Sequence, residues 1–480
     1  MLDFTQDRQP VHTRHIFIEK NNVEGSFSDQ FQCVRAICTW TDLIPFFSKK
    51  WMCGCNRFIS SSTHNTCIDS IFVYLFKFYY LRLKNYNDPI YGFISIPTPF
   101  ISTIIQEPVF QRLRRIQQMG LSHYVFNGAT HHRFAHALGA MHLMRKTLDI
   151  LLTKGTPISD SEREAAMIAI LLHDLGHGPF SHALEGILTD NVSHEYWSLS
   201  LMKMLNEKHS GKLSLAIQMF EGRYKRSFFN QLISSQLDMD RLDYLKRDSF
   251  YSGVTEGNIS TDRIIAMLRV HQDKLVVEEK GLYSIEKFLL ARRMMYWSVY
   301  LHKTSYVAEE VLKRIILRAK EMLQQGETIR ASADLLYFLS TSRSSEPKVE
   351  MKHYAAIDDV DVWSMIKAGV THQDSVFSNL CEMVLSRRLP KIEVSNESFS
   401  SEFLDKQKNI AMTDLGLSPQ EISYFVFDGK MKNMAYNLEQ SPIILIDKNG
   451  VTKELLAGSD ESNLKMLTKA VTKYYCCYPK

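Results

Sequence analysis

A short segment, residues 170–182, concentrates side chains that can do chemistry. His173, Asp174, His177 and His182 lie within ten positions, after an apolar run and among glycine and proline residues that break helices. An adjacent histidine and aspartate can face one divalent metal ion, because imidazole nitrogens and carboxylate oxygens are both metal ligands. The two further histidines can donate to phosphate oxygens or act as general acids. An isolated histidine usually has only a structural role, but this concentration of groups predicts a catalytic metal site.

Two neighbouring segments carry residues of the same kinds. Upstream, Arg133 and His136 lie at the start of an amphipathic stretch, where a guanidinium can approach a bound anion. Downstream, His194 and Glu195 begin another helical pattern. Both segments must fold back onto residues 170–182 if their side chains are to act together.

A third segment has both a structural and a chemical interpretation. Ser235 and Asp238 match a capping-box pattern, so Asp238 can simply begin a helix. Within that helix Asp240, Tyr244 and Asp248 share one face, because they are spaced by four residues. A charged stripe more often faces solvent. A tyrosine on the same face, together with the ligand-rich segments upstream, favours a place in the site.

The composition is that of an ordinary globular protein. The chain has 480 residues, of which 45% are hydrophobic and 23% charged, with a formal net charge of +4. This charge is too small to indicate a nucleic-acid or membrane partner. The eight cysteines are unevenly placed, and the N-terminus has no secretory signal pattern. Residues 68–83 are apolar but interrupted by charges, so no membrane span is expected. We therefore expect a soluble, cytoplasmic protein with free thiols.

Three regions are expected along the chain. Residues 1–86 mix aromatic, cysteine, serine and asparagine residues without sustained periodicity, which indicates either a poorly ordered extension or a leader that is not part of the native product. The spacing of Cys53, Cys55, His64 and Cys67 fits none of the common structural zinc patterns. Residues 87–330 are expected to form an all-helical domain and residues 331–480 a small α+β appendage. The fold class is therefore mainly α.

The periodicity predicts particular elements. Helices are expected over residues 136–152, 161–173, 194–205, 213–220 and 284–323, and over 99–119 with a kink or restart at Pro108. In the appendage we expect strands at 391–394 and 422–427, a hairpin at 442–453 and a last helix at 460–474. Asn449 and Gly450 would form the turn of that hairpin.

Taken together, the motifs resemble a known family. His136, the His173-Asp174 pair and Asp240 reproduce the H…HD…D signature of the HD-domain phosphohydrolases, and the resemblance runs from about residue 88 to residue 303. The longer strings around these residues are similar to the branch of deoxynucleoside triphosphate triphosphohydrolases. One departure is Ala135, where the family usually has glutamate. Since this position is beside a ligand and is not itself a ligand, we expect tuning of the site rather than its loss.

The resemblance implies one divalent metal ion per active site, with iron or manganese favoured and zinc, nickel or magnesium also compatible. The implied ligands are His136, His173, Asp174 and Asp240. The implied catalytic residues, which would contact the phosphates, protonate the leaving group or align the nucleophile, are His177, His182, His194 and Glu195. Glu195 would act by orienting a histidine.

Substrate contacts are implied in the same way. Arg133 and Arg241 would neutralise a triphosphate. Arg292, Tyr296 and Tyr300 recur every four residues and resemble the family's substrate helix, in which arginine binds a distal phosphate and tyrosine packs on the sugar. The family often has histidine at the position of Tyr296. A tyrosine against C2′ would exclude ribose. The remaining implied contacts are Gln118 near the sugar or base, Asp248 at the 3′-hydroxyl, and Tyr244.

The leading hypothesis is metal-dependent hydrolysis of deoxynucleoside triphosphates to deoxynucleoside and triphosphate. The alternatives are an HD phosphohydrolase acting on another nucleotide or phosphomonoester, and a non-catalytic nucleotide sensor. The complete ligand set argues against the sensor, because unused buried charges are costly. By resemblance we expect a homo-oligomer, a dimer or tetramer, with a nucleotide activator as a candidate second ligand, and no nucleic-acid partner. The base preference, the metal and the existence of an allosteric site stay open.

Overall fold

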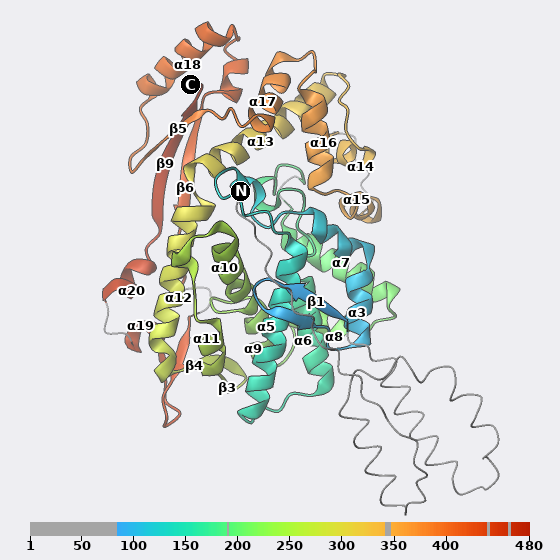
Figure 1. Ribbon diagram of the computed structural model, residues 1–480, viewed down its shortest axis with the longest axis vertical. Coiled ribbons are helices and arrows are strands. Elements are labelled where there is room, and N and C mark those ends of the chain that lie inside the picture. Colours follow the sequence, from blue (N-terminus) through green and yellow to red (C-terminus); the bar gives the residue numbers. More distant parts are fainter. Residues whose placement is uncertain (1–83, 190–191, 341–346, 439–441, 459–461) are drawn as a thin grey trace, which may run out of the picture. The chain divides into compact units, whose positions relative to one another are not determined.

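The computed structural model describes residues 84–189, 192–340, 347–438, 442–458 and 462–480 (Figure 1). The described residues all belong to one compact unit of the chain, Leu83–Lys480. The expectations for the N-terminal extension, including the cysteines near residue 60, fall almost wholly outside the described residues. The boundaries expected at residues 87 and 330 stay a prediction.

Three helices form the centre of the described unit: α5 (Arg133–Thr153), which packs against both α6 (Asp160–Leu172) and α10 (Met239–Ser252). A capping box between Ser159 and Glu162 begins α6, which is buried all round over residues 165–172. Asp238 caps α10 by accepting a hydrogen bond from the backbone of Arg241, which confirms its predicted place at a helix start. Gly253, with φ of 72°, ends α10.

Shorter elements surround this centre. An N-terminal hairpin pairs β1 (Asn85–Asp88) with β2 (Gly92–Ser95). The elements that follow before α10 are α3 (Pro99–Gln106), α4 (Pro108–Gln111), η3 (Arg112–Arg115), η4 (Gly120–Tyr124), η5 (Ser181–Ala183), α7 (His194–Lys208), α8 (Ser214–Phe220) and α9 (Ser227–Ile233). After α10 come η6 (Thr255–Gly257), α11 (Thr261–Met267), β3 (Leu268–His271), β4 (Lys274–Glu278), η7 (Glu279–Gly281) and α12 (Leu282–Met295). The helices predicted before residue 230 are confirmed, with boundaries shifted by a few residues.

The single helix predicted over residues 284–323 is wrong. A π-helical segment, η8 (Tyr296–Tyr300), follows α12, and a new helix, α13 (Lys303–Gln324), begins after His302. The side chain of His302 accepts a hydrogen bond from the backbone of Thr304 and so caps α13. Because the apolar period continues across the break, the sequence pattern did not reveal it.

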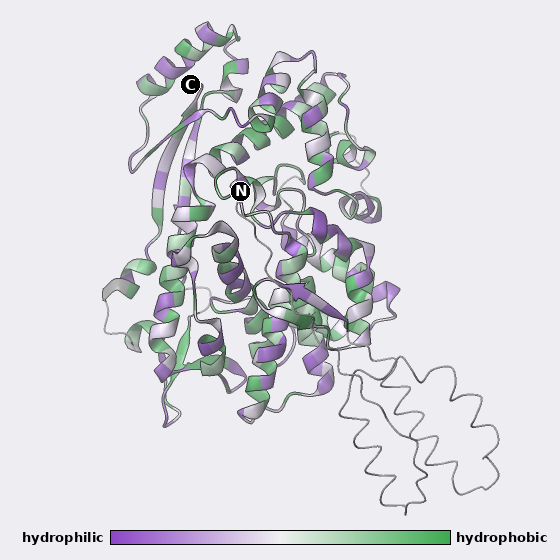
Figure 2. Ribbon diagram, in the orientation of Figure 1, coloured by the Kyte–Doolittle hydropathy of each residue, from purple (hydrophilic) through white to green (hydrophobic). Residues whose placement is uncertain are grey.

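The C-terminal region combines helices with two sheets. Its helices are α14 (Ala333–Leu339), α15 (Pro347–Tyr354), α16 (Asp359–Gly369), α17 (Ser375–Leu385), α18 (Ser401–Leu415), η9 (Glu421–Tyr424), α19 (Leu455–Gly458) and α20 (Ser462–Leu467). Its strands are β5 (Lys391–Ser395), β6 (Phe427–Asn433), β7 (Ile444–Ile446), β8 (Thr452–Glu454) and β9 (Val471–Tyr478). The sheet orders are β5-β9-β6 and β3-β4-β7-β8, in which β7 runs parallel to β4. In Figure 2, apolar and polar residues alternate along α12 and α18, as in helices with one buried face.

Two predictions for this region are confirmed and two are wrong. The strand at residue 391 and the hairpin that turns near Gly450 are present as β5 and β7–β8. Residues 422–426 do not form a strand, because the side chains of Ser418 and Glu421 accept from each other's backbone nitrogens and begin the helical turn η9; strand β6 begins only at Phe427. The last predicted helix ends at Leu467. The aromatic and cysteine residues that follow form β9, the central strand of its sheet.

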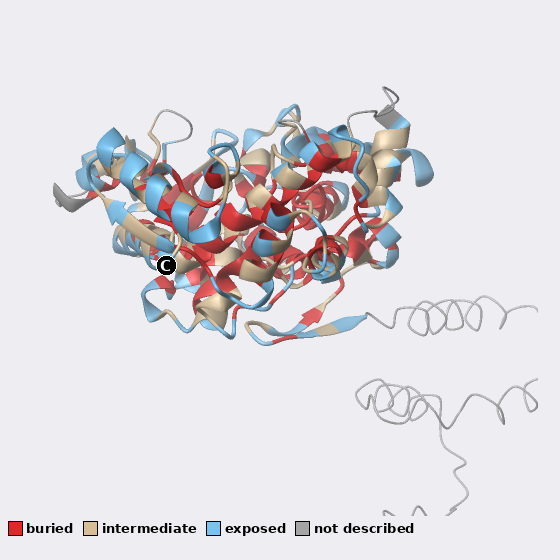
Figure 3. Cartoon of the chain, turned by 90° about the horizontal axis from the view of Figure 1, so that it is seen from above, coloured by how far each residue is buried: buried red, intermediate tan, exposed pale blue. Residues whose placement is uncertain are grey.

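Buried apolar residues form two clusters, and the segment rich in histidine passes from one to the other. Ile170, Leu171, Leu172 and Leu175 belong to the first cluster, with α5, α6 and α10. Phe180 and Leu184 belong to the second, with α13 and the C-terminal helices. Figure 3 shows buried residues gathered in the interior of the described unit. Within the described residues, no helix combines the length and the apolar character needed to cross a lipid bilayer.

One buried side chain ties this crossing segment to the C-terminal helices. The Arg112 guanidinium donates to the carbonyl oxygens of Leu175 and His177, both at 2.9 Å. It also donates to those of Ile357 at 2.8 Å and Tyr354 at 3.3 Å. Arg112 is fully buried, so these carbonyls have no access to water as an alternative donor.

We expect Arg112→Met to lower the free energy of unfolding by at least about 2 kcal/mol. The substitution leaves buried carbonyl oxygens without a hydrogen-bond donor, and each such oxygen costs roughly 1–3 kcal/mol. Urea denaturation measures this change. Arg114→Met is the matched control. Arg114 is exposed on the same turn, with its guanidinium over the Phe134 ring, and its loss should cost under about 1 kcal/mol. Equal stability of wild type and Arg112→Met would contradict the assigned role.

Candidate metal centre and substrate site

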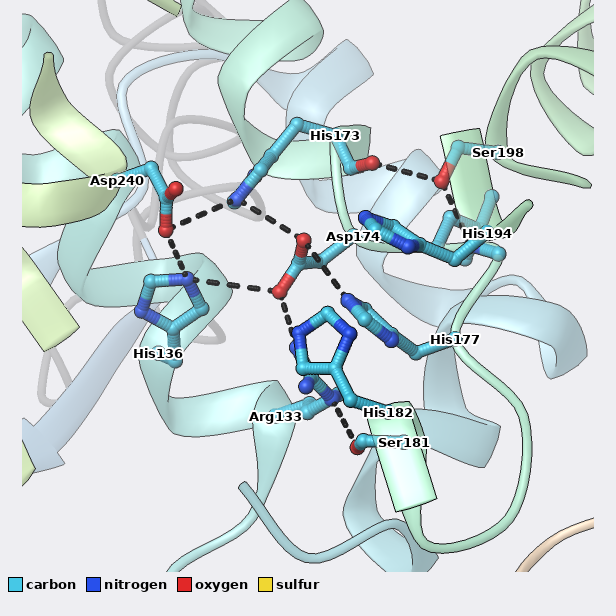
Figure 4. A network of polar contacts seen from close by, with 12 residues as sticks. Arg133, His136, His173, Asp174, His177, Ser181, His182, His194, Ser198 and Asp240 are labelled. Carbon is cyan, nitrogen blue, oxygen red and sulfur yellow. Dashed lines mark hydrogen bonds and ion pairs between the residues drawn. The ribbon is translucent and has the colours of Figure 1, made fainter. Parts of the chain in front are cut away.

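Three helices present the four residues predicted as metal ligands (Figure 4). His136 lies in the first turn of α5, His173 and Asp174 directly follow α6, and Asp240 lies in the first turn of α10. Since α5 packs against both other helices, residues more than a hundred positions apart meet at one point.

The ligand atoms converge. Asp240 Oδ1 lies 3.2 Å from His136 Nε2 and 3.4 Å from His173 Nε2. Asp174 Oδ1 lies 3.2 Å from His173 Nε2, and Asp174 Oδ2 lies 3.7 Å from His136 Nε2. The structure therefore brings all four predicted residues together.

Both histidine rings are oriented by hydrogen bonds from their far nitrogens. His136 Nδ1 donates to Asp243 Oδ2 at 2.8 Å, and His173 Nδ1 donates to the carbonyl oxygen of Ile170 at 2.6 Å. Each Nε2 therefore presents a lone pair toward the cluster. Within the part of the chain that the structure describes, neither Nε2 has a hydrogen-bond partner, although both are buried. Such a pair of unsatisfied nitrogens fits a metal ion.

A chain of buried charges supports His136 from behind. Asp243 accepts two hydrogen bonds from Arg247, at 2.8 and 3.0 Å, and Arg247 also donates to Asp88 in the hairpin at 2.7 Å. A Cβ on Gly139 would lie 2.0 Å from Asp243 Oδ1. Glycine is required at this position because the carboxylate and the guanidinium occupy the space of a side chain.

The electrostatics of the cluster favour a cation. Burial lowers the pKa of His136, but the facing carboxylates of Asp240 and Asp243 outweigh it and raise this pKa to about 10. Burial likewise opposes protonation of His173, but Asp174 and Asp240 raise its pKa. The carboxylates thus draw positive charge into a buried place, which a divalent ion supplies when the imidazoles are neutral ligands. His136, His173 and Asp240 could hold such an ion, since their ligand atoms lie within 4.8 Å of one another.

Arg133 lies against this cluster. Its guanidinium is buried and donates to Asp174 Oδ2 and, at 2.7 Å, to Ser181 Oγ. Ser181 and the preceding Phe180 both have positive φ, of 52° and 53°. Asp359 of α16 holds this strained turn by accepting from the Phe180 backbone at 2.8 Å and from the Gln117 backbone at 2.9 Å.

Three histidines gather beside Asp174. The rings of His177 and His194 are stacked with centroids 4.0 Å apart, and the His182 ring lies 4.9 Å from His177 and 5.3 Å from His194. His177 Nε2 is 3.4 Å from Asp174 Oδ1. Sequence reasoning grouped these three residues as phosphate-facing, and the structure places them side by side.

Glu185, which sequence reasoning missed, orients two of these rings. It accepts from His182 Nδ1 at 2.9 Å, and from the Nδ1 and backbone nitrogen of His194 at 2.8 and 2.9 Å. Glu195, the residue expected to orient a histidine, is 66% exposed, and its nearest oxygen lies 3.8 Å from His194 Nε2. The spacing of His182 and Glu185, three residues apart, was the available signal.

The stacked pair has opposite pKa shifts. Burial and the nearby Arg133 guanidinium lower the pKa of His177 well below its ordinary value. Burial also opposes protonation of His194, but the hydrogen bond to Glu185 raises its pKa. His194 is therefore the better proton donor and His177 the neutral member.

Most residues predicted to contact a sugar form a second connected group. Tyr300 Oη donates to Asp248 Oδ2 at 2.8 Å. The Tyr300 ring lies 5.1 Å from the Tyr296 ring and 6.2 Å from the Tyr244 ring. The Arg292 guanidinium lies 6.0 Å from the Tyr296 ring. Because α10 carries Asp240, Tyr244 and Asp248, one helix joins this group to the ligand cluster.

The remaining predicted contacts lie at the edges of the two groups. Arg241 donates from its backbone and its guanidinium to Asp238, the cap of α10. Gln118 donates from its backbone to the carbonyl oxygen of His131 at 2.9 Å. Its side-chain oxygen is buried and, as far as the structure is described, has no hydrogen-bond partner.

Two family models match the chain. The HD domain model covers residues 133–248, which span His136 to Asp248, and the HD associated region covers residues 259–351. The first of these ranges contains all four predicted ligands.

Relatives extend the match. The uncharacterized protein YwfO of Bacillus subtilis is 32% identical over 389 residues, which are 78% of this chain and 87% of that protein. The deoxynucleoside triphosphate triphosphohydrolase SAMHD1 of Homo sapiens is 27% identical over 332 residues, which are 60% of this chain and only 50% of that protein. A crystal structure of a phosphohydrolase from Bacteroides thetaiotaomicron is 45% identical, with a TM-score of 0.80, and matches 83% of this chain and 100% of that one. The chain therefore belongs to the HD-domain phosphohydrolase family.

Proposed function

We propose that the protein hydrolyses deoxynucleoside triphosphates to deoxynucleoside and triphosphate. The observation that carries this proposal is the continuity of the site along α10. Asp240 faces the two imidazoles, Tyr244 lies four residues further on, and Asp248 accepts the hydrogen bond of Tyr300. A ligand cluster at one end and a tyrosine-lined group at the other suit a phosphate chain joined to a sugar. The similarity to SAMHD1 supports the same substrate class.

His136, His173, Asp174 and Asp240 would hold one divalent ion, for which we propose iron or manganese, the metals favoured by the resemblance. When bound, the ion supplies a Lewis acid that polarises the α-phosphate and lowers the pKa of water. His136 and His173 are pre-oriented for this task, since their far nitrogens are already engaged by Asp243 and Ile170.

His194 is the proposed general acid. Water attacks the α-phosphorus, the bond from phosphorus to the 5′-oxygen breaks, and His194 protonates that oxygen of the leaving deoxynucleoside. Glu185 favours the protonated ring. His177 would donate to a phosphate oxygen, and the exposed His182 would contact the phosphates from the solvent side. Arg133, Arg241 and Arg292 would balance the charge of the triphosphate.

The tyrosines are the proposed basis of sugar selection. Burial and Asp248 raise the pKa of Tyr300 well above its ordinary value, so the hydroxyl stays protonated and donates to Asp248. A Tyr300 ring held this way would crowd a 2′-hydroxyl, and Tyr244 and Tyr296 would close the pocket around the deoxyribose. Gln118 would contact the sugar or base.

Further properties stay predictions. We propose a homo-oligomer with a nucleotide activator, on the basis of the family resemblance alone. A cytoplasmic location follows from the proposed substrates, which are made and used inside cells. The buried cysteines Cys381, Cys476 and Cys477 carry free thiols, which agrees with a reducing compartment.

Metal-loaded protein incubated with the four deoxynucleoside triphosphates, singly and mixed, should release triphosphate and deoxynucleoside, identified by ion-exchange chromatography. Asp240→Ala should abolish the release and lower the bound metal measured by plasma mass spectrometry, because it removes a carboxylate that faces both imidazoles.

Asp262→Asn is the matched control, since Asp262 is 76% exposed and pairs with the surface residue Lys146. It should keep both turnover and metal. Orthophosphate or a nucleoside monophosphate as product would favour another HD phosphohydrolase activity. Full turnover by Asp240→Ala would overturn the metal assignment.

Glu185→Gln should lower kcat about 10- to 100-fold, the usual cost of losing a residue that orients a catalytic group. Because the carboxylate raises the pKa of His194, its loss should lower that pKa. The proton donor is then lost at lower pH, and the alkaline limb of the kcat profile should move to lower pH.

Glu195→Gln provides the comparison. Its carboxylate is exposed and 3.8 Å from His194, so both kcat and the pH profile should stay close to wild type. A larger effect of Glu195→Gln than of Glu185→Gln would restore Glu195 as the orienting residue.

A further inference from the structure

His131 occupies a buried position that the proposed chemistry does not use. Its side chain lies against α10, with Nε2 2.7 Å from Asp248 Oδ1. The ring stacks on Tyr251, with centroids 4.3 Å apart and an interplanar angle of 15°. The residue is only 5% exposed. A buried ring fixed both by stacking and by a hydrogen bond to a carboxylate has one orientation.

The Asp248 carboxylate is consequently held from two sides. Both contacts must be donated to it, because an ionised carboxylate only accepts hydrogen bonds. His131 Nε2 donates to Oδ1 and Tyr300 Oη donates to Oδ2. Each oxygen keeps a second lone pair for a further donor. The carboxylate is thus fixed in direction while it remains able to accept from a ligand hydroxyl.

The backbone of His131 reaches a third residue of the same group. Its carbonyl oxygen accepts from the Gln118 backbone at 2.9 Å, beside a β-bridge between Gln117 and His132. The loop before it is pressed onto α10, since a Cβ on Gly128 would lie 2.5 Å from the carbonyl oxygen of Tyr251. Little freedom is therefore left for His131 to move relative to α10.

We propose that His131 is the positioning residue of the sugar subsite, setting Asp248 and Tyr300 through its ring and Gln118 through its backbone. The inference rests on the proposed function and deepens it, because it names the residue on which recognition of the sugar depends. His131 itself touches no substrate in this scheme. It acts by fixing the acceptor for the 3′-hydroxyl and, through the same carboxylate, the tyrosine beside C2′.

A satisfied core histidine is the competing interpretation, and the two differ in what they predict for related substrates. Loss of a core residue would weaken every substrate equally. Loss of a positioning residue would remove the advantage that a 3′-hydroxyl gives and leave the phosphate contacts intact. The comparison therefore needs two nucleotides that differ only at C3′, and two variants that differ only in whether a donor remains.

The experiment compares one deoxynucleoside triphosphate with its 2′,3′-dideoxy analogue of the same base. In His131→Gln the amide nitrogen extends about as far as Nε2 and can still donate to Asp248, whereas the side chain of His131→Asn is too short. We expect wild type to prefer the 3′-hydroxyl about 10-fold or more in kcat/KM, as for a hydrogen bond to a charged group. His131→Gln should keep most of that preference, and His131→Asn should reduce it to about 2-fold or less.

His132→Asn is the matched control, because this neighbouring side chain is exposed, and it should keep the wild-type preference. Bound metal should be unchanged in all three variants. If His131→Asn lowers kcat/KM equally for both nucleotides, or if wild type shows no preference, the inference is overturned. If His131→Asn does not fold, the retained or lost preference of His131→Gln decides between the two interpretations.

Failure of the proposed function can be distinguished from failure of the positioning role. If wild type turns over no deoxynucleoside triphosphate, the proposed function is wrong. The same nucleotide pair is then measured by titration calorimetry. A 3′-hydroxyl preference in dissociation constants that His131→Asn abolishes would sustain the positioning role, and absence of binding or equal weakening would overturn it as well.

Discussion

The structure depends on neutralising carboxylates that are buried close together. Asp174, from the turn after α6, and Asp240 and Asp243, from α10, converge on His136, and burying such charges without partners would be prohibitive. Arg247 and Arg133 supply fixed positive charge on either side, paired with Asp243 and Asp174. Asp240 remains, and its Oδ1 faces the imidazoles of His136 and His173. The buried arginines therefore make the cluster tolerable to the fold, and the position that they leave is the one a metal ion would fill.

The segment rich in histidine, residues 173–182, is held in place by the side chains of other elements rather than by a helix of its own. Beyond His173 it must leave α6, turn at Gly176 and carry His177 to the second apolar cluster. A Cβ on Gly176 would lie 2.1 Å from the Ser198 backbone nitrogen, so α7 packs directly on this turn. Arg112 and Asp359 supply the hydrogen bonds that a helix would otherwise provide. Residues near 357, far from the motif in sequence, thus fix its geometry.

The sequence predicts well those features that neighbouring residues determine, and less well those that depend on residues far away in the chain. His136, His173 and Asp240 were predicted as ligands because their neighbours form specific strings and because each begins or ends a helix. Glu195 was predicted to orient a histidine because it is adjacent to His194 in the sequence. The residue that bonds His194 is Glu185, which a turn brings back to the His194 ring. The last predicted helix, 460–474, ran into the first half of strand β9, because the place of β9 between β5 and β6 depends on residues much earlier in the chain. The role of His131 was not predicted, because only the structure shows its contact with Asp248.

The π-helical segment η8 carries two of the residues predicted to contact the sugar. A helix continuing regularly from α12 through residue 300 was the sequence expectation, but η8 widens the backbone before His302 begins α13. Such segments are rare and are frequently found at functional sites. Here the widened turn carries Tyr296 and Tyr300, whose rings lie 5.1 Å apart, and lets the Tyr300 hydroxyl reach Asp248. The carboxylate of Asp248 that Tyr300 reaches is also bonded by His131. The departure from ideal helix and the buried histidine thus act on one carboxylate.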